Sequence, residues 1–224
     1  NDVSKTLFKL GEDGNIIGGF EITSDKILGN NIIINSSYKH LTIKKFIKNY
    51  KLKKKLPKLF LTFEKNRLET GGGLKNAIEK FNNSNLLVIN GDSLLQNEDK
   101  NCPIKNLFSN YKEPDMDVLL LLSRKKDTLG YIGKGDYRKL AISNASKLTS
   151  KNSRFSQKYI FTGWQIINKK IMNSFPQKTF SLKKVYDLAE KKGRLYGVVH
   201  KGNFFHIGDP KSYSIVNRVF RVSG

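Results

Sequence analysis

The chain alternates short, continuous apolar runs with longer segments whose apolar residues recur at helical spacing. Continuous apolar runs of strand length are typical of strands buried on both faces. They occur at residues 30–35, 59–63, 85–90 and 116–122. The segments that begin after His40 and after the glycine run at 71–73 have the spacing of amphipathic helices. Strands and helices in this order imply right-handed crossovers and a doubly wound α/β sheet.

The pattern changes after residue 123, where glycines interrupt the apolar runs. Residues 130–143 suggest a hairpin, and the sequence YIFTGWQII at 159–167 predicts another long central strand. The remaining strand-like segments, 194–200 and 203–207, are expected to form a closing hairpin. We therefore expect a Rossmann-like, doubly wound, mixed sheet that is mostly parallel, in a single domain.

Two helices are expected in the last third of the chain. Residues 181–191 have helical spacing, with Ser181 as a candidate N-cap and Gly193 just past the end. A last helix is expected to begin at Pro210. A chain of 224 residues can form one core, so we expect one domain over residues 1–224.

The composition is strongly basic, with 41 Lys and Arg against 19 Asp and Glu and a net charge of +22. Such a charge favours partners that carry phosphate, and a phosphorylated small substrate would benefit from it as much as a nucleic acid. The lysines are dispersed and form no recognisable nucleic-acid-binding motif, so a compositional bias stays open as the simpler explanation.

Cysteine usage and hydropathy indicate a cytoplasmic protein. Cys102 is the single cysteine, so an intrachain disulfide and a cysteine metal cluster are excluded. No apolar run approaches the roughly 18 residues of a membrane span, and the N-terminus lacks the hydrophobic core of a signal peptide. We expect neither a membrane partner nor a nucleic-acid partner.

The sequence NGD at 90–92 places a carboxylate just after the apolar run LLVI. Ligands of open α/β sheets bind beyond the carboxyl ends of the strands, where Asp92 could hold Mg²⁺ against substrate phosphates. Asn, Gly and Asp are also ordinary turn residues, so a simple turn remains an equal alternative.

The sequence ETGGG at 69–73 follows the apolar run LFLTF and precedes a helical segment. Backbone N–H groups at a helix N-terminus can bind an anion or the polar edge of a base, and glycines permit close approach. A strained turn that needs positive φ is the alternative. The chain contains no complete GxGxxG or GxxxxGK[ST] motif, which argues against dinucleotide and P-loop sites.

Taken together, the motifs resemble those of the sugar-phosphate nucleotidyltransferases, in the branch of N-acetylmuramate-1-phosphate uridylyltransferase and mannose-1-phosphate guanylyltransferase. The resemblance covers essentially the whole chain, and LETGGG followed by NGD is its most specific part. The matching segments are SKTLFKL (4–10), IIIN (32–35), LETGGGLKNAI (68–78), LLVINGD (86–92), FTGWQII (161–167) and FFHIGDP (204–210).

This resemblance implies an enzyme that joins a nucleoside triphosphate to a sugar 1-phosphate and releases pyrophosphate. It places Gly71, Gly72 and Gly73 against the nucleotide base, in a loop shaped by Glu69 and Thr70. The expected cofactor is Mg²⁺, with Mn²⁺ as a substitute. The sequence leaves open which base and sugar are used, and whether the protein is a homo-oligomer.

The same resemblance assigns roles to residues near the phosphates and the sugar. Asn90 and Asp92 would lie near the ribose and phosphates, with Asp92 as the metal ligand. Lys5 would counter phosphate charge, although a surface lysine is the alternative. Thr162 and Gly163 would line the sugar pocket, although Thr162 can equally be an ordinary strand residue.

Two departures from the family pattern bear on these roles. The family opens with a strand and a glycine-rich phosphate loop, whereas this chain begins at Asn1, directly after the matching position. We therefore expect a missing N-terminal segment. The family also has Asp where this chain has His206, so His206 is a candidate metal ligand that suits transition metals better than Mg²⁺. A plain strand residue is the alternative.

Asp209 could replace the absent carboxylate near His206. However, the sequence Asp209-Pro210 is a strong N-cap and N1 pair for the last helix, so a structural role is the preferred interpretation.

Two rival functions remain at this point. The first is a catalytically weakened relative that binds a nucleotide or sugar nucleotide as a regulatory protein. The features that distinguish it from an active enzyme are His206 and the true N-terminus. A nucleic-acid-binding domain is suggested by charge alone, and salt-sensitive binding to arbitrary DNA would support it.

Overall fold

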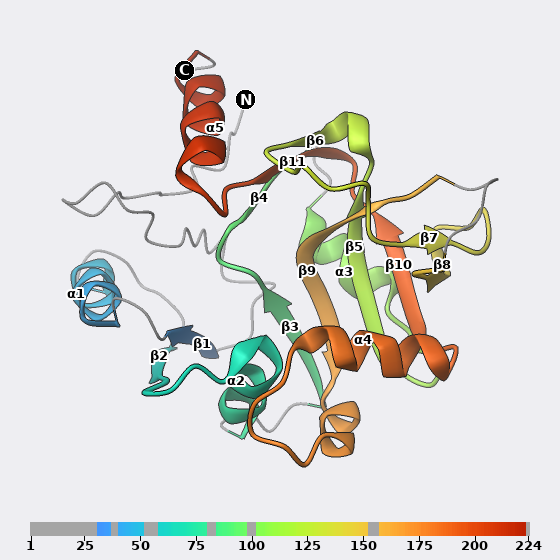
Figure 1. Cartoon of the computed structure of the whole chain (residues 1–224), viewed down its shortest axis with the longest axis horizontal. Helices are drawn as coiled ribbons and strands as arrows, with labels where there is room; N and C mark the ends of the chain where they lie inside the picture. The colour runs from blue at the N-terminus through green and yellow to red at the C-terminus, as the bar shows by residue number, and fades with distance from the viewer. Residues whose placement is uncertain are drawn as a thin grey trace.

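The computed structural model describes residues 31–36, 40–51, 58–79, 84–97, 102–151 and 157–222. Lys5 therefore lies outside the described residues, and its predicted role stays a prediction. A six-stranded sheet forms the centre of the molecule (Figure 1). Its strands, in spatial order, are β3 (Asn85–Ile89), β9 (Ile160–Asn168), β5 (Val118–Ser123), β10 (Leu195–Val199), β8 (Ala145–Thr149) and β7 (Arg138–Lys139).

The central strand β5 is buried on both faces, which explains its continuous apolar sequence. Val118, Leu120 and Leu122 pack into a core shared with helix α4 (Leu182–Lys191). Leu119 and Leu121 pack into a second core on the opposite face, shared with helix α3 (Pro103–Asn110). The two helices therefore cover opposite faces of the sheet, as the prediction of a doubly wound arrangement requires.

Strand β9 is central, as predicted, but it runs antiparallel to both of its neighbours, β3 and β5. The strands β3, β5 and β10 all run in the same direction, and β9 lies between β3 and β5. Of the eight strand pairs among the described residues, five are antiparallel. The mixed α/β fold is confirmed, whereas the expectation of a mostly parallel sheet is wrong for these pairs.

The predicted closing hairpin does not form. Strand β10 pairs with β5 and β8, whereas β11 (Gly202–His206) leaves that sheet and pairs with β4 (Ser93–Asn97) and β6 (Thr128–Leu129). Apolar residues of β4 and β11 form a third small core with helix α5 (Pro210–Val222). A hairpin does form in this region, but it is shifted from the predicted range 130–143: β7 pairs antiparallel with β8, which lies beyond residue 143.

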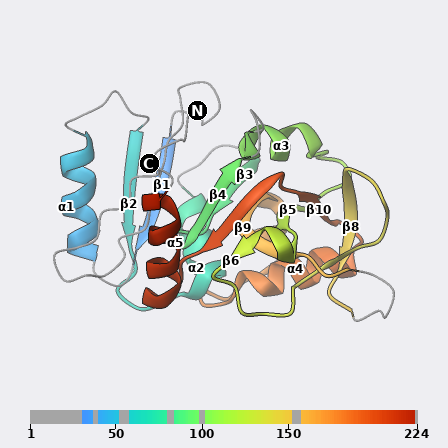
Figure 2. The same ribbon diagram turned by 90° about the horizontal axis from the view of Figure 1, so that it is seen from above.

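A parallel two-stranded sheet lies at one side of the molecule. It consists of β1 (Asn31–Ser36) and β2 (Lys58–Phe63), with helix α1 (His40–Lys51) beside it and helix α2 (Glu69–Ile78) after it. Figures 1 and 2 both place α1 and β2 at the opposite side from β8. Two 3₁₀ helices, Lys125–Asp127 and Lys169–Ser174, complete the described elements.

Helix termini test the expectations about turns and caps. Ser181 caps α4 by accepting a hydrogen bond from the Lys183 N–H, and Gly193 follows the helix with φ +65°, both as predicted. Helix α2, in contrast, begins at Glu69, so the three glycines lie inside it and not before it. Within the described part of the chain, no helix has the length and apolar character needed to cross a membrane.

Candidate functional site

The end of β3 is held against β9 by backbone contacts that require a glycine. The Asn90 N–H donates to the Gly163 carbonyl at 3.0 Å. Gly163 has φ +84°, and a Cβ there would lie 2.8 Å from the Asn90 Cβ. The Ser93 hydroxyl donates to the Thr162 carbonyl. Four of the predicted positions, Asn90, Asp92, Thr162 and Gly163, therefore lie in one neighbourhood beyond the carboxyl end of β3.

Thr162 has a structural role in this neighbourhood. Its side chain is 1% exposed, and its hydroxyl donates to the Leu121 carbonyl at 2.9 Å. This bond spans the irregularity at which the β5–β9 register shifts, between Leu120 and Leu122. The hydroxyl proton is therefore engaged within the sheet, and contact of Thr162 with a sugar stays a prediction.

Asp92 and His206 form a partly exposed acid–base pair. Asp92 Oδ2 lies 3.6 Å from His206 Nε2, and the side chains are 47% and 36% exposed. Strand pairing places His206 opposite Ser93, and the Ile207 N–H donates to the Asp92 carbonyl at 2.9 Å. The contact with Asp92 raises the pKa of His206 above its usual value, and the contact with His206 lowers the pKa of Asp92.

Gly208 keeps this pair accessible. A Cβ at Gly208 would lie 2.7 Å from His206 Cε1, 3.1 Å from His206 Nε2 and 3.4 Å from Asp92 Oδ2. A side chain at this position would therefore press on the imidazole and cover the space beside both groups. The glycine leaves the carboxylate and the imidazole open to a ligand.

Asp209, in contrast, is engaged as a helix cap. Its two carboxylate oxygens accept the Ser212 N–H at 2.9 Å and the Ser212 hydroxyl at 2.7 Å. The hydrogen bond from the backbone of Ser212 lowers the pKa of Asp209. Helix α5 begins at the next residue, Pro210. The predicted N-cap is therefore confirmed.

The donor set suits a cation that is shared with a substrate. Among the described residues, no group of three or more His, Cys, Asp and Glu side chains could enclose a metal ion. Mg²⁺ in phosphate-transfer sites is commonly held by one or two carboxylates together with substrate phosphates and water, which Asp92 alone can satisfy. The imidazole of His206 suits Zn²⁺ and other later transition metals better than Mg²⁺.

The three glycines of ETGGG are explained by close packing. The Gly71 and Gly72 N–H groups both donate to the Phe180 carbonyl, at 2.8 and 3.0 Å. A Cβ would lie 2.5 Å from the Phe180 ring at Gly71 and 2.1 Å from the Lys178 carbonyl at Gly72. None of the three glycines has positive φ; that conformation occurs at Glu69, with φ 59°. The alternative prediction, that these glycines form a turn with positive φ, is therefore wrong.

Glu69 and Thr70 are the exposed residues of this first helical turn. The Thr70 hydroxyl accepts the Leu182 N–H at 3.0 Å, which fixes the start of α4 against α2. Since the Gly71 and Gly72 N–H groups already have acceptors, these two groups are not available to a base. Contact between a nucleotide and residues 69–73 stays a prediction, for which Glu69 and Thr70 offer the exposed polar groups.

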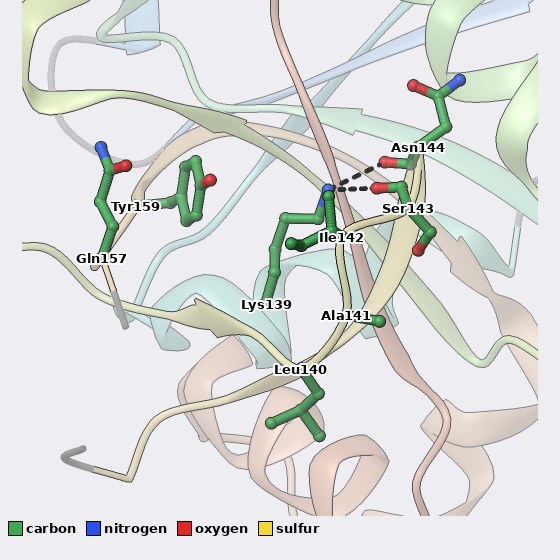
Figure 3. A pocket seen from close by; sticks show the side chains of 8 residues that line it. All are labelled: Lys139, Leu140, Ala141, Ile142, Ser143, Asn144, Gln157 and Tyr159. Carbon is green, nitrogen blue, oxygen red and sulfur yellow. Dashed lines mark hydrogen bonds between the residues drawn. The ribbon is translucent and has the colours of Figure 1, made fainter. Parts of the chain in front are cut away.

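A hollow of about 490 Å³ lies elsewhere, beside the hairpin of β7 and β8. It is lined by residues 139–144, Gln157 and Tyr159 (Figure 3). Lys139 Nζ donates to the Ser143 and Asn144 carbonyls at 2.5 and 3.2 Å, so the lysine fixes the loop that forms one wall. The predicted site residues do not line this hollow, and the candidate site therefore remains at the end of β3.

Sequence reasoning missed one buried carboxylate. Glu64 directly follows β2 and is 6% exposed. It accepts hydrogen bonds from Asn35 Nδ2 at 2.5 Å and from the Leu68 N–H at 2.9 Å. The signal that identified Asp92, a carboxylate at the end of an apolar run, also identifies Glu64.

Known proteins resemble the chain in both sequence and fold. No profile of a known protein family matches it. It is 27% identical to N-acetylmuramate alpha-1-phosphate uridylyltransferase of Caulobacter vibrioides over 157 residues, which is 70% of this chain and 63% of that protein. The match thus spans less than two thirds of the relative's length.

Solved structures agree on the fold. HddC from Yersinia pseudotuberculosis, complexed with GMP-PN, is 24% identical with a TM-score of 0.63, over 84% of this chain and 78% of that chain. A UDP-glucose pyrophosphorylase complexed with UDP-glucose is 14% identical with a TM-score of 0.63, over 87% and 81% of the two chains. These comparisons confirm the resemblance to the sugar-phosphate nucleotidyltransferases and their mixed α/β fold.

Proposed function

We propose that the protein is a sugar-1-phosphate nucleotidyltransferase, which joins a nucleoside triphosphate to a sugar 1-phosphate. The observation that carries this proposal is the exposed pair of Asp92 and His206 beyond the carboxyl end of β3, beside Asn90 and Gly163. This is where ligands of open α/β sheets bind. The relatives with this fold include a uridylyltransferase and a pyrophosphorylase.

The proposed reaction needs two anions to be brought together. An oxygen of the sugar 1-phosphate attacks the α-phosphorus of the nucleotide, and the bond from that phosphorus to the bridging oxygen of the β-phosphate breaks. Pyrophosphate leaves with the electron pair. Positioning and charge neutralisation supply most of such catalysis, and no protein nucleophile is required.

In this proposal each residue has a role suited to its surroundings. Asp92 would hold Mg²⁺ or Mn²⁺, which would neutralise phosphate charge, and His206 would assist as a second ligand. Asn90 would face the ribose and phosphates, and Glu69 and Thr70 the base. Lys5 would counter phosphate charge. The excess of cationic side chains favours both anionic substrates by long-range attraction.

The test is pyrophosphate release by the full-length gene product. The assay would combine UTP, GTP, ATP, CTP or dTTP with a panel of sugar 1-phosphates, in Mg²⁺ or Mn²⁺. UTP and GTP come first because the relatives are a uridylyltransferase and a protein bound to GMP-PN. We expect turnover that requires both substrates, and a loss of roughly 10²- to 10³-fold in Asp92→Ala.

Asp209→Ala is the matched control, because Asp209 caps α5 through Ser212. It should affect stability more than turnover. Saturable nucleotide binding without turnover on any substrate pair would contradict the proposed transferase and support a regulatory binding protein.

A further inference from the structure

The carboxylate of Glu64 links the end of the small sheet to the first turn of α2. Its backbone continues the strand ladder, since the Glu64 N–H donates to the Ser36 carbonyl at 2.9 Å. Its Oε1 accepts a hydrogen bond from Asn35 Nδ2. The other polar side-chain atom of Asn35, Oδ1, accepts a hydrogen bond from the Thr62 hydroxyl at 2.8 Å. Its Oε2 accepts the N–H of Leu68, the residue before α2.

This polar cluster, which consists of Asn35, Thr62 and Glu64, lies directly against the helix. A Cβ at Gly73 would lie 2.3 Å from Glu64 Oε1 and 2.4 Å from Asn35 Nδ2. The absence of a side chain at Gly73 therefore lets the cluster reach the helix backbone. Steric contact at Gly73 and the hydrogen bond to Leu68 fix the first turn from this side.

The opposite side of the same turn is fixed by residues that precede α4. The Phe180 carbonyl accepts from Gly71 and Gly72, and the Phe180 N–H donates to the Leu68 carbonyl at 3.2 Å. Leu68 is therefore bonded through its N–H to Glu64 and through its carbonyl to Phe180. Between these two clamps, Glu69 is held at φ 59°, a conformation that costs about 1–3 kcal/mol outside glycine and persists only where its surroundings impose it.

A carboxylate that is 6% exposed is costly to bury, and a well-packed apolar side chain often gives equal or greater stability. One oxygen of Glu64 accepts the N–H of Leu68, at the start of the turn that carries the exposed residues Glu69 and Thr70, and the other accepts from Asn35 of β1. We propose that Glu64 is a positioning residue, which sets the orientation of residues 69–73 for binding the nucleotide. This inference rests on the proposed function, since it assigns how the same site recognises its nucleotide.

The test is an exchange of the two partners. Glu64→Gln alone places an amide opposite the Asn35 amide, so one of the hydrogen bonds is lost. In the double variant Asn35→Asp/Glu64→Gln, the new amide at position 64 can donate to the new carboxylate at position 35. The amide oxygen can still accept the Leu68 N–H, and the second carboxylate oxygen can accept the Thr62 hydroxyl. The exchange therefore restores these three hydrogen bonds, with donor and acceptor reversed only between positions 35 and 64.

Nucleotide binding by the full chain would be measured by calorimetry with UTP, GTP, ATP, CTP and dTTP in turn. We expect Glu64→Gln to raise the dissociation constant of the preferred nucleotide roughly tenfold. Its KM should rise in proportion, with kcat within about twofold. The double variant should return to within about threefold of the wild type. Glu79→Gln, at the exposed end of α2, is the control and should change nothing.

The outcomes separate this inference from the proposed function. A wild-type protein that binds none of the nucleotides would overturn the function itself, and the inference with it. Binding in the wild type with an unchanged dissociation constant in folded Glu64→Gln would overturn the positioning role alone. If Glu64→Gln does not fold, Thr62→Val takes its place, because it removes only the hydroxyl that orients Asn35. A roughly threefold weaker dissociation constant in Thr62→Val supports the role, and an unchanged one overturns it.

Discussion

Asp92 and Glu64 both follow an apolar strand, yet the two carboxylates have opposite surroundings. Asp92 is 47% exposed and faces His206 across 3.6 Å, with Gly208 leaving the pair uncovered. Glu64 is 6% exposed, and both of its oxygens accept hydrogen bonds within the fold. The position after a strand thus identifies a carboxylate at the edge where open α/β sheets bind ligands, but the packing above it decides whether that carboxylate is exposed or holds another element.

The comparison predicts that the two regions fail in different ways. Around Glu64, close packing of α2 on residues 178–180 and on the strand ends sets the geometry, so substitutions at the packed glycines should act first through stability. Around Asp92, the side chains are partly exposed, so substitutions should act first through activity.

Gly72→Ala should produce the largest effect, on the packed side. The new Cβ would lie 2.1 Å from the Lys178 carbonyl, a backbone atom that cannot move without shifting the segment before α4. We expect the free energy of unfolding to fall by about 1–3 kcal/mol, as for other overpacked sites. Urea denaturation monitored by circular dichroism measures this change.

The control for this change is Asn76→Ala, at an exposed position of the same helix. It should stay within about 0.5 kcal/mol of the wild type. Equal stability of Gly72→Ala and Asn76→Ala would show that the first turn of α2 is not tightly packed, and the contrast between the two regions would fail.

Gly208→Ala should produce an intermediate effect, on the open side. The methyl group would lie 2.7 Å from His206 Cε1, and the imidazole, as a side chain, can rotate away at little cost in stability. If His206 is a metal ligand as proposed, we expect pyrophosphate release to fall about tenfold, as for changes in the surroundings of metal ligands. The unfolding free energy should change by less than about 0.5 kcal/mol.

Ser214→Ala, at an exposed position of α5, serves as the control for Gly208→Ala and should retain wild-type turnover. If Gly208→Ala lost stability but kept full turnover, the region around Asp92 would be packed like the region around Glu64, and the contrast between the two would be wrong.

The sequence predicted those features that depend on local pattern. The burial of β5 on both faces was predicted from its unbroken apolar run. The position of Asp92 was predicted from the end of the apolar run that forms β3. The pairing of β11 with β4 and β6 depends on partners that are distant along the chain, so local spacing could not reveal it. The same holds for the glycines of α2, whose necessity arises from contact with Lys178 and Phe180.

The roles of individual polar groups were harder to predict for the same reason. The Thr162 hydroxyl bonds to the backbone at the β5–β9 irregularity, a feature that exists only after the two strands have paired. Glu64 was missed because it opens the polar stretch EKNR, which resembles an exposed loop in sequence. Its burial results from the close approach of α2, at Gly73, to Glu64 and to Asn35 of β1.

The pH dependence of the Asp92–His206 pair gives the smallest and most specific prediction. The raised pKa of His206 contributes stability that is fully present below about pH 6.5 and is lost as pH rises through the folded-state pKa. The lowered pKa of Asp92 contributes stability that is present above about pH 3.9 and is lost as pH falls through its folded-state pKa. The pair should therefore stabilise the fold most between about pH 4 and 6.5.

Comparing the wild type with His206→Gln in chelator-treated buffer tests this window. Because both side chains are more than one third exposed, the difference in unfolding free energy should be only about 0.5 kcal/mol near pH 5.5 and should vanish towards pH 8.5. In an Asp92→Asn background the same substitution should show a weaker pH dependence, since the charge of Asp92 is gone and only Gly130 and Asp209 still raise the pKa of His206. A difference that grew with pH would mean that His206 is neutral in the folded state, and the open region would then lack the coupled charge pair that distinguishes it from Glu64.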